Sequence, residues 1–490
     1  MDYNARYKKA CSHYDLWRGL LSDVYNYVIP ERNGWENKTE GQEENIPIHD
    51  DTAVLSAPRY ASRMQWSLMP EWRNWANFVS GTDVPEDQKK VVDSQLQEFT
   101  NEFFDYLSRS NFYVQIQPSL IDSAISTGAI LGEEAPFTDD ALIHWRSIPL
   151  HELKIEGGQN GVIENAWWCQ RIMGEIIMEK WGDTIPAELK EKIDKKPVEL
   201  YDIVLGQVKK SDGYHIVLMW DKEVFQETVH EKARLICFGI SAMPSETYRR
   251  GPALQVFPTI RRLNKVQELY LTAAEYDIGG IWYGMDDGVF NPYTFTPLPA
   301  VINPVMSNPN GGPPFGRVDA GTNVQLSSLI IEDMQDTIRK AFFVDPMGDI
   351  NDPVRTLGEQ QLRMQEFMKD QGAAVSRLYY ELVDRIIDLQ YDIMLQRGIA
   401  PKLKINSKEI DVRYVSPLSR QDEMDQFQNT RMFLDSVSGL PPEVVGAKVK
   451  IEDIPQLLID DLGLPKTLKR SEEELKQMAA DESEVPDEQA

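Results

Sequence analysis

Two pairs of adjacent aspartates are the residues whose type and spacing come nearest to catalytic chemistry in this sequence. They are Asp139-Asp140 and Asp286-Asp287. Glycoside hydrolysis uses two carboxyl groups at a set separation, one as an acid and one as a nucleophile or base. The sequence alone does not place these four carboxyl groups, and aspartates are also typical of turns. We therefore interpret both pairs as turn residues, with a carbohydrate-active or other soluble enzyme as the alternative function.

Histidines and cysteines in this sequence lack the spacing of a metal site. His151-Glu152 and His230-Glu231 each begin like the helix of a zinc protease, but neither is followed by a second histidine at the required spacing. The sequence contains neither a glycine-rich loop closed by Lys and Ser/Thr nor a nucleophile elbow. The three cysteines are odd in number and far apart, which argues against a disulfide framework. We predict no catalytic residue, no metal and no cofactor.

Composition limits the classes of partner. The 490 residues are too many for one core, so we expect two or three domains. No run of about 18 apolar residues occurs, and the first residues lack the apolar core of a signal peptide, so we predict no membrane span and a reducing cytoplasm. The net charge is −27, whereas proteins that grip DNA phosphates are usually basic. If nucleic acid is a partner, we expect it to pass the protein rather than be bound, and the alternative is that the acidity only keeps a cytoplasmic protein soluble. A solitary cytoplasmic scaffold is a third possible function.

The elements around which the chain is organised lie between residues 250 and 346. Apolar residues at three- and four-residue steps predict one helix over Leu254–Ile278 and another over Leu326–Phe343. Pro258 predicts a late start or a kink in the first helix. The stretch between the helices is rich in proline and glycine and cannot build a core of its own. We expect neighbouring subunits to complete this segment.

The amino-terminal half predicts helices followed by mostly antiparallel strands, an α+β fold that is mainly helical over the whole chain. The predicted helices cover residues 1–29, 52–68, 86–109 and 118–126, with two short ones at 173–181 and 187–195. The predicted strands cover residues 141–148, 153–155, 162–172, 200–208, 214–220 and 233–238. Asp212-Gly213 is typical of a hairpin turn.

The carboxy-terminal part predicts one long helix and an acidic end. A loop with glycine and aspartate covers 347–353, and the longest helical pattern runs from Leu357 to Gln396 with Gly372 at an expected kink. One or two strands are expected within 402–415 and short helices within 417–464. The last twenty residues are acidic and poor in apolar groups, which is typical of disorder.

Three stretches resemble the portal protein, or head-to-tail connector, of short-tailed double-stranded DNA bacteriophages. The first, APRYASRMQWSLMPEWRNWANF at 57–78, is similar to the family's helix closed by a proline and followed by an aromatic strand. The second, SAISTGAILG at 123–132, is similar to its small-residue turn from helix to strand. The third, YRRGPALQVFPTIRRLNKVQELYLTAAEYDIGG at 248–280, is similar to the helix that enters its stem. The long helix from Leu357 agrees in place and length.

This resemblance implies a ring of about twelve subunits with an axial channel at one capsid vertex, through which double-stranded DNA is packaged and ejected. The implied parts are a wing (1–253), two stem helices (254–279 and 326–344), a clip (280–325), a tunnel loop (345–356), a long kinked helix with returning wing strands (357–416), a crown (417–470) and a disordered tail (471–490). The implied partners are the terminase large subunit, the major capsid protein, a scaffolding protein and a tail adaptor protein. The implied location is the virion, and the host cytoplasm during assembly.

Three groups of site residues follow from the implied parts. We expect stem residues Arg261, Arg262 and Lys265 to pair with acids of an adjacent stem helix, such as Glu332, Asp333 or Asp336, or to form a basic ring in the channel. Solvated charges are the alternative. We expect the tunnel-loop residues Met347, Gly348, Asp349 and Asp352 to face DNA, and a plain surface turn is the alternative. The clip residues expected to contact the motor, or to be buried between neighbouring clips, are Trp282, Tyr283, Phe290 and Tyr293.

Overall fold

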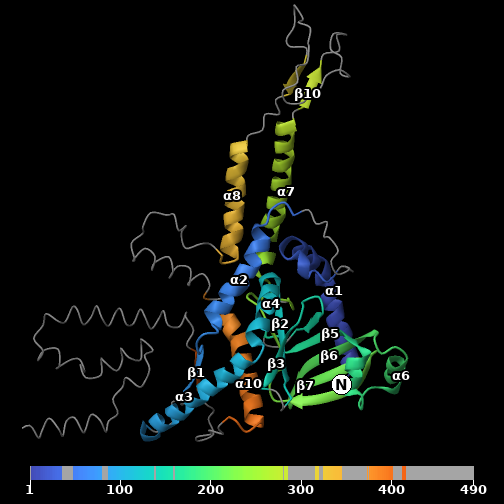
Figure 1. Ribbon diagram of the computed structural model, residues 1–490, viewed down its shortest axis with the longest axis vertical. Coiled ribbons are helices and arrows are strands. Elements are labelled where there is room, and N and C mark those ends of the chain that lie inside the picture. The colour runs from blue at the N-terminus through green and yellow to red at the C-terminus, as the bar shows by residue number, and fades with distance from the viewer. Residues whose placement is uncertain are drawn as a thin grey trace, which may run out of the picture. The chain divides into compact units, whose positions relative to one another are not determined.

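Helices and strands are mixed along the chain, which confirms the α+β prediction (Figure 1). The computed structural model describes residues 2–35, 48–79, 86–136, 140–157, 161–244, 246–279, 281–284, 315–318, 324–344, 372, 375–400 and 411–414. Contacts between residues divide the chain into two compact units. The first comprises Met1–Arg63 with Ser110–Ile393, and the second comprises Met64–Arg109 with Met394–Ala490.

The described helices and strands have the following bounds. The helices are α1 (Tyr3–Val28), η1 (Pro30–Arg32), α2 (Thr52–Leu68), α3 (Glu86–Arg109), α4 (Phe112–Ile125), α5 (Gly174–Trp181), α6 (Ala187–Lys195), α7 (Pro252–Gly279), α8 (Val324–Ala341), the π-helical turn η2 (Tyr379–Val383) and α10 (Asp384–Gln396). The strands are β1 (Ala76–Val79), β2 (Gly128–Glu134), β3 (Ile143–Ser147), β4 (Leu153–Glu156), β5 (Asn165–Met173), β6 (Leu200–Lys210), β7 (Gly213–Trp220), β8 (Glu223–His230), β9 (Leu235–Phe238), β10 (Ile281–Gly284), β11 (Phe315–Val318) and β12 (Asp411–Tyr414).

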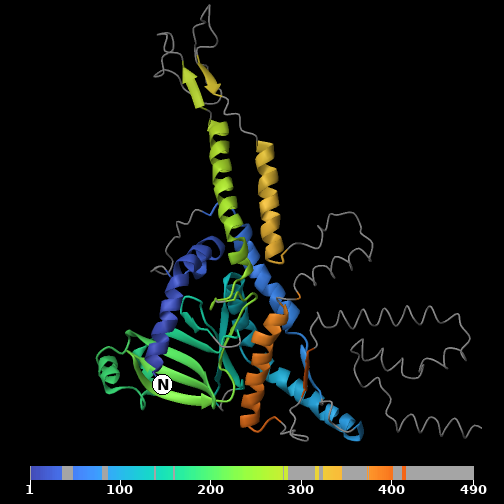
Figure 2. The same cartoon turned by 180° about the vertical axis from the view of Figure 1, so that it is seen from behind.

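A five-stranded antiparallel meander, in the order β4-β5-β6-β7-β8, forms the larger sheet of the first unit. Helix α1 lies along it, with the Tyr7 ring 5.7 Å from the ring of Trp167 on β5 (Figure 2). Trp167 is fully buried with apolar side chains of β6 and β7. The amphipathic pattern of residues 1–29 thus covers one face of this sheet.

The smaller sheet of the first unit has the strand order β3-β2-β9, and α4 packs on β2 and β3. Our prediction that the fourth helix begins at Pro118 is wrong, because α4 begins at Phe112 and contains Pro118 in its interior. Phe112, Tyr113 and Ile116 are all buried. Burial of these side chains outweighs the hydrogen bond that the proline cannot make.

In the second unit, α3 packs on β1, which pairs with β12. Aromatic side chains make up this contact, with Trp75 buried against Phe104 at 5.0 Å between ring centroids. Phe78 on β1 likewise contacts Phe103 at 5.3 Å. The aromatic stretch after α2 is therefore partly core, although Trp72 within it is 65% exposed.

Two strands and one helical irregularity differ from the sequence predictions. Strand β8 was not predicted, and it follows β7 through a turn in which Asp221 and Lys222 both have positive φ. Strand β2 begins at Gly128; the local pattern predicted no strand at this position, whereas the family resemblance implied a turn from helix to strand within 123–132. The long helical pattern contains a π turn at Tyr379–Val383, and Gly398, with φ of 73°, follows its end.

Candidate functional site

Helices α7 and α8 lie side by side and contain the stem residues named from the sequence (Figures 1 and 2). Helix α7 starts at Pro252 and is continuous through Pro258, so the late start predicted from that proline is wrong. Buried Leu254, Phe257 and Ile260 lie on this first part of the helix, where packing compensates for the missing amide donor.

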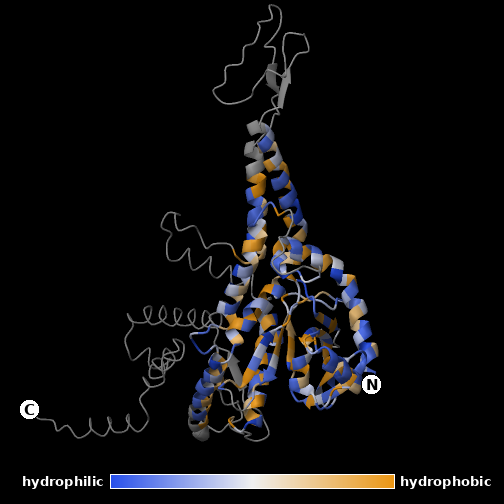
Figure 3. Cartoon of the chain, turned by 45° about the vertical axis from the view of Figure 1, so that its right-hand side comes forward, coloured by the Kyte–Doolittle hydropathy of each residue, from blue (hydrophilic) through white to orange (hydrophobic). Residues whose placement is uncertain are grey.

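The outer half of this helix pair, which comprises Lys265–Tyr276 of α7 and the residues of α8 around Leu329, buries almost no side chains. Between Lys265 and Tyr276 no described residue of α7 is buried. The exposed apolar side chains of the two helices are Leu269 (57%), Leu271 (44%), Tyr276 (54%), Leu329 (63%) and Ile330 (42%). Figure 3 shows apolar and polar residues interspersed along both helices. A helix pair with apolar side chains on outward faces is suited to contact another chain.

Hydrogen bonds from the segment before α2 join the inner parts of α7 and α8. The Oδ1 atom of Asn264 on α7 accepts from the backbone N–H of His49 at 2.9 Å and of Asp50 at 3.3 Å. The Oδ2 atom of Asp50 accepts from Nε2 of Gln335 on α8 at 2.7 Å, and its Oδ1 atom accepts from the N–H of Thr52 at 2.9 Å. Asp50 therefore stabilises the start of α2 and holds α8 at the same time.

Helix α8 ends in a Schellman motif without glycine. The N–H of Val344 donates to the carbonyl of Arg339 at 2.9 Å, and that of Phe343 to the carbonyl of Lys340 at 3.0 Å. Phe343 has φ of 56°, which is uncommon for an aromatic residue. Its carbonyl accepts from Nη1 of Arg63 on α2 at 2.6 Å, and its ring lies 6.5 Å from that of Tyr60. The sequence predicted that this helix ends at Phe343, two residues after its observed end at Ala341.

The small-residue turn at 123–128 holds the segment that enters α7. The hydroxyl of Ser126 donates to the carbonyl of Arg249 at 2.6 Å, and the N–H of Arg249 donates to the hydroxyl of Thr127 at 3.0 Å. A Cβ added at Gly251 would lie 2.2 Å from the carbonyl oxygen of Ala124. Two of the stretches that resemble the portal family are thus in direct contact.

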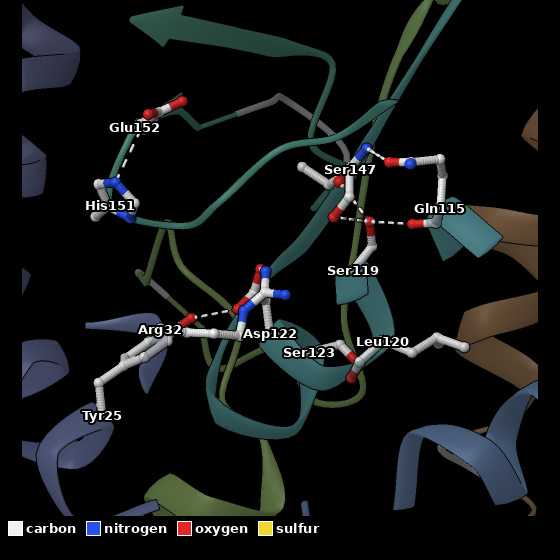
Figure 4. A network of polar contacts seen from close by, with 11 residues as sticks. Tyr25, Arg32, Gln115, Ser119, Leu120, Asp122, Ser123, Ser147, His151 and Glu152 are labelled. Atoms are coloured by element: carbon white, nitrogen blue, oxygen red, sulfur yellow. Dashed lines mark hydrogen bonds and ion pairs between the residues drawn. The ribbon is translucent and has the colours of Figure 1, made fainter. Parts of the chain in front are cut away.

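Polar side chains on α4 connect it to α1 and η1 and also to β2 of the smaller sheet (Figure 4). Buried Asp122 accepts from the hydroxyl of Tyr25 and from Nη2 of Arg32, each at 2.7 Å. Burial raises the pKa of Asp122, while Arg32 acts in the opposite direction. The hydroxyl of Ser119 donates to the carbonyl of Ala129 on β2 at 2.8 Å. These contacts position the turn after α4, and none of them forms a reactive group.

The predicted stem cations make local contacts within one chain. The Cζ atom of Arg261 lies 5.6 Å from the Phe257 ring centroid, and Nζ of Lys265 lies 2.9 Å from an oxygen of Glu268. Arg262 is exposed. Among the described residues of a single chain, none of the three pairs with an acid of α8. Pairing with an adjacent copy therefore stays a prediction.

The other predicted site residues lie partly outside the described residues. Trp282 and Tyr283 are in β10, which pairs antiparallel with β11 in the register Trp282↔Arg317. The tunnel-loop residues and two clip residues lie outside, namely Met347, Gly348, Asp349, Asp352, Phe290 and Tyr293. Asp286, Asp287 and Asp139 also lie outside the described residues.

The described residues contain no group of three or more His, Cys, Asp or Glu side chains that could hold a metal ion. His151 and His230, which begin the two zinc-like sequences, both have their pKa lowered to about 4, chiefly by burial. In the described part of the chain, no helix is long and apolar enough to cross a bilayer.

Sequence reasoning missed the polar residues that join these elements. Asp50, Asn264 and Gln335 carry no motif, and the Arg249–Glu381 ion pair joins residues 132 positions apart. A polar residue inside an apolar helical stripe can indicate a buried polar contact, and Asn264 is such a residue in the sequence.

Two comparisons with known proteins find similar sequences. Residues 1–468 match the family model described as bacteriophage head to tail connecting protein. A relative from Bordetella phage BPP-1, described as a probable portal protein, is 20% identical over 474 residues, covering 88% of this chain and 82% of its own length.

Proposed function

The chain belongs to the family of bacteriophage head to tail connecting proteins, and on that premise we propose that it is the subunit of a portal ring. Copies of the chain close around an axial channel at one capsid vertex, through which double-stranded DNA is packaged and later ejected. The division into wing, stem, clip, tunnel loop and crown described above is part of this proposal. Terminase docks on the clip during packaging, and a tail adaptor protein takes that place afterwards.

The observation that carries the proposal is the coreless outer half of the α7–α8 pair. Five large apolar side chains there are at least 42% exposed in one chain. Burial of apolar surface contributes about 25 cal/mol per Å², so these side chains favour association. Because both helices present apolar groups, a copy on each side can cover them, as cyclic symmetry requires.

The acidic composition supports passage of DNA rather than retention. The chain carries 78 acidic and 51 basic residues, for a net charge of −27. A ring multiplies this charge, and an acidic channel wall repels phosphates instead of exchanging counterions with them. The proposal assigns no catalytic residue to this chain. It also uses no cofactor, because the energy for packaging comes from the separate motor.

The test is the mass of the purified protein in solution by light scattering, with negative-stain images of the same sample. We expect a ring of about twelve copies with a central hole. The variants Leu269→Asp and Leu329→Asp place a charge on the outer half of α7 or α8 and should shift the protein toward monomer. Leu200→Asp on β6 is the control, since Leu200 is 57% exposed and lies on the five-stranded sheet rather than on the helix pair. A small oligomer at every concentration would overturn the proposal.

A further inference from the structure

An open pocket of about 790 Å³ lies between the β4–β5 connection, the β9–α7 connection and the helical residues before α10. Apolar side chains from all three segments line it, among them Ile163, Met243 and Tyr380. Met243 is 44% exposed and Tyr380 is 55% exposed. The pocket is therefore open to solvent at its rim, and its wall combines apolar with polar and charged groups.

Most of the charged groups in the pocket wall are already paired. Glu246 accepts two hydrogen bonds from Arg250, each at 2.7 Å. Glu381 accepts from Nη2 of Arg249 at 2.6 Å and from its Nε at 3.3 Å. Arg249 is 3% exposed in its side chain and donates a further hydrogen bond to the carbonyl of Gly161. These four side chains are structural and contribute no net charge.

Among the described residues that line the pocket, Arg377 is the charged group that remains. Its Nη1 atom lies 3.3 Å from Oε1 of Glu381, the same oxygen that Arg249 contacts at 2.6 Å. Its side chain is 36% exposed. Two guanidinium groups therefore share one carboxylate, which leaves one positive charge facing the pocket. Arginine can bind a second carboxylate with its free N–H groups.

The backbone of the helical wall is irregular at this point. Residues Tyr379–Val383 form a π turn, and π turns in proteins frequently mark functional sites. Within this turn the side chain of Glu381 is buried while that of Tyr380 is exposed at the pocket rim. The Oε2 atom of Glu381 also accepts from the N–H of Gly239 at 3.2 Å. The turn thus holds Arg377 and Tyr380 beside a fixed carboxylate.

The shape and charge of the pocket limit what it can hold. Small-molecule sites usually bury 70–90% of their ligand, whereas this pocket is open at its rim, where Met243 and Tyr380 are exposed. A side chain of another polypeptide can bind in an open pocket, because the rest of that polypeptide covers the side that the pocket leaves exposed. The chain itself is strongly acidic, so a second copy offers many carboxylates to a pocket with one excess positive charge.

We propose that this pocket receives an acidic side chain and its apolar neighbour from a second copy of the chain, with the carboxylate bound to Arg377. The contact is heterologous, because the pocket of one copy meets a different surface of the next, as a closed ring requires. This inference rests on the proposed portal ring, and it assigns a specific anchor to the interface outside α7 and α8.

The first test is the charge reversal Arg377→Glu, followed by sedimentation velocity over a range of protein concentrations. Arg249 still pairs with Glu381 in this variant, so the subunit should fold, and circular dichroism with thermal unfolding checks that it does. We expect the concentration needed for ring assembly to rise at least about tenfold, equivalent to about 1.4 kcal/mol. The control is Arg171→Glu, which reverses an exposed arginine paired only with exposed Asp202.

The second test does not depend on whether the charge-reversal variant folds. A photoreactive benzoylphenylalanine replaces Tyr380, and rings are assembled from a mixture of isotopically labelled and unlabelled chains. We expect crosslinks between labelled and unlabelled chains, at a peptide that contains Asp or Glu beside an apolar residue. Crosslinks confined to one chain, or their absence in assembled rings, would overturn the inference.

The outcomes separate this inference from the proposed function. Normal rings from Arg377→Glu, without crosslinks between copies, would refute the pocket contact and leave the portal ring standing. A wild-type chain that never assembles would refute both. If Arg377→Glu does not fold, the crosslinks decide the question.

Discussion

The Nη2 atom of Arg249 lies 2.6 Å from Oε1 of Glu381, and the two side chains are only 3% and 2% exposed. The pair joins Arg249, which lies just before the start of α7, to Glu381 in a π turn 132 residues later in the chain. Removing one partner of a buried ion pair leaves an uncompensated charge, which typically costs several kcal/mol.

For Glu381→Gln we therefore predict a loss of about 3–5 kcal/mol in the free energy of unfolding, measured by urea denaturation. The comparison is Arg171→Ala, which breaks the Arg171–Asp202 pair on the surface, where the side chains are 74% and 79% exposed. That change should cost less than about 1 kcal/mol. Equal losses in the two variants would show that the Arg249–Glu381 pair does not stabilise the fold.

Gly251→Ala should destabilise the entry to α7. The added Cβ would lie 2.2 Å from the carbonyl oxygen of Ala124 and 2.5 Å from that of Ser123, both of them backbone atoms. We expect a loss of about 1–3 kcal/mol, seen as a lower thermal midpoint. Gly19→Ala in α1 is the matched control: it has no atom within 4 Å of the new Cβ and should gain about 0.5–1 kcal/mol. A neutral Gly251→Ala would contradict the close approach.

Asp384 gives a prediction about pH. Burial, with Asp388 as a second cause, raises the pKa of Asp384 from 3.8 to about 6. Between these values the unfolded carboxyl group has lost its proton and the folded one has kept it. The free energy of unfolding therefore falls as pH rises through this window. We predict that Asp384→Asn becomes more stable than the wild type by about 1–2 kcal/mol above pH 6, after allowing for partial exposure.

Urea denaturation at a series of pH values between 3.5 and 7.5 measures this difference. It should grow from about pH 4 and become constant above about pH 6. Asp388→Asn should lower the pKa of Asp384 toward its usual value, because Asp388 is the second cause of the raised pKa, and should therefore narrow the pH window. A stability difference for Asp384→Asn that is independent of pH would contradict the raised pKa.

The three cysteines should differ in their reactivity toward a thiol reagent, such as an aromatic disulfide that releases a coloured thiolate. Burial raises the pKa of Cys237 to about 12, and it raises those of Cys11 and Cys169 as well. Because the thiolate is the reactive form, Cys237 should react only when the protein unfolds. Cys11 and Cys169 are partly exposed and should react slowly at pH 8 and faster as pH rises. Three fast thiols in the folded protein would contradict the structure.

Local sequence patterns were sufficient for most helices. Helices α2, α3 and α6 have the predicted bounds, because in each one an apolar stripe at helical spacing coincides with clear start and stop signals. The hairpin turn at Asp212-Gly213 was also predicted correctly, since its residue types favour that turn. The resemblance to portal proteins was stated from three short stretches, and the family comparison confirms it.

Prolines and unpredicted strands show where local patterns fail. Pro118 and Pro258 each suggested a helix boundary, yet α4 and α7 continue through them, because buried neighbours supply more free energy than one hydrogen bond. Strand β8 was missed because it is an edge strand with exposed residues such as Val224 and Val229, so its pattern lacks a buried face.

The sequence by itself determined the helices, the absence of familiar catalytic motifs, the acidic balance and the family. Only the tertiary structure decided which distant residues meet, such as Gln335 with Asp50 and Arg377 with Glu381. The physical reason is that helical periodicity and turn preferences act over a few residues, whereas a buried polar contact requires two chain segments to be brought together by the packing of all the others.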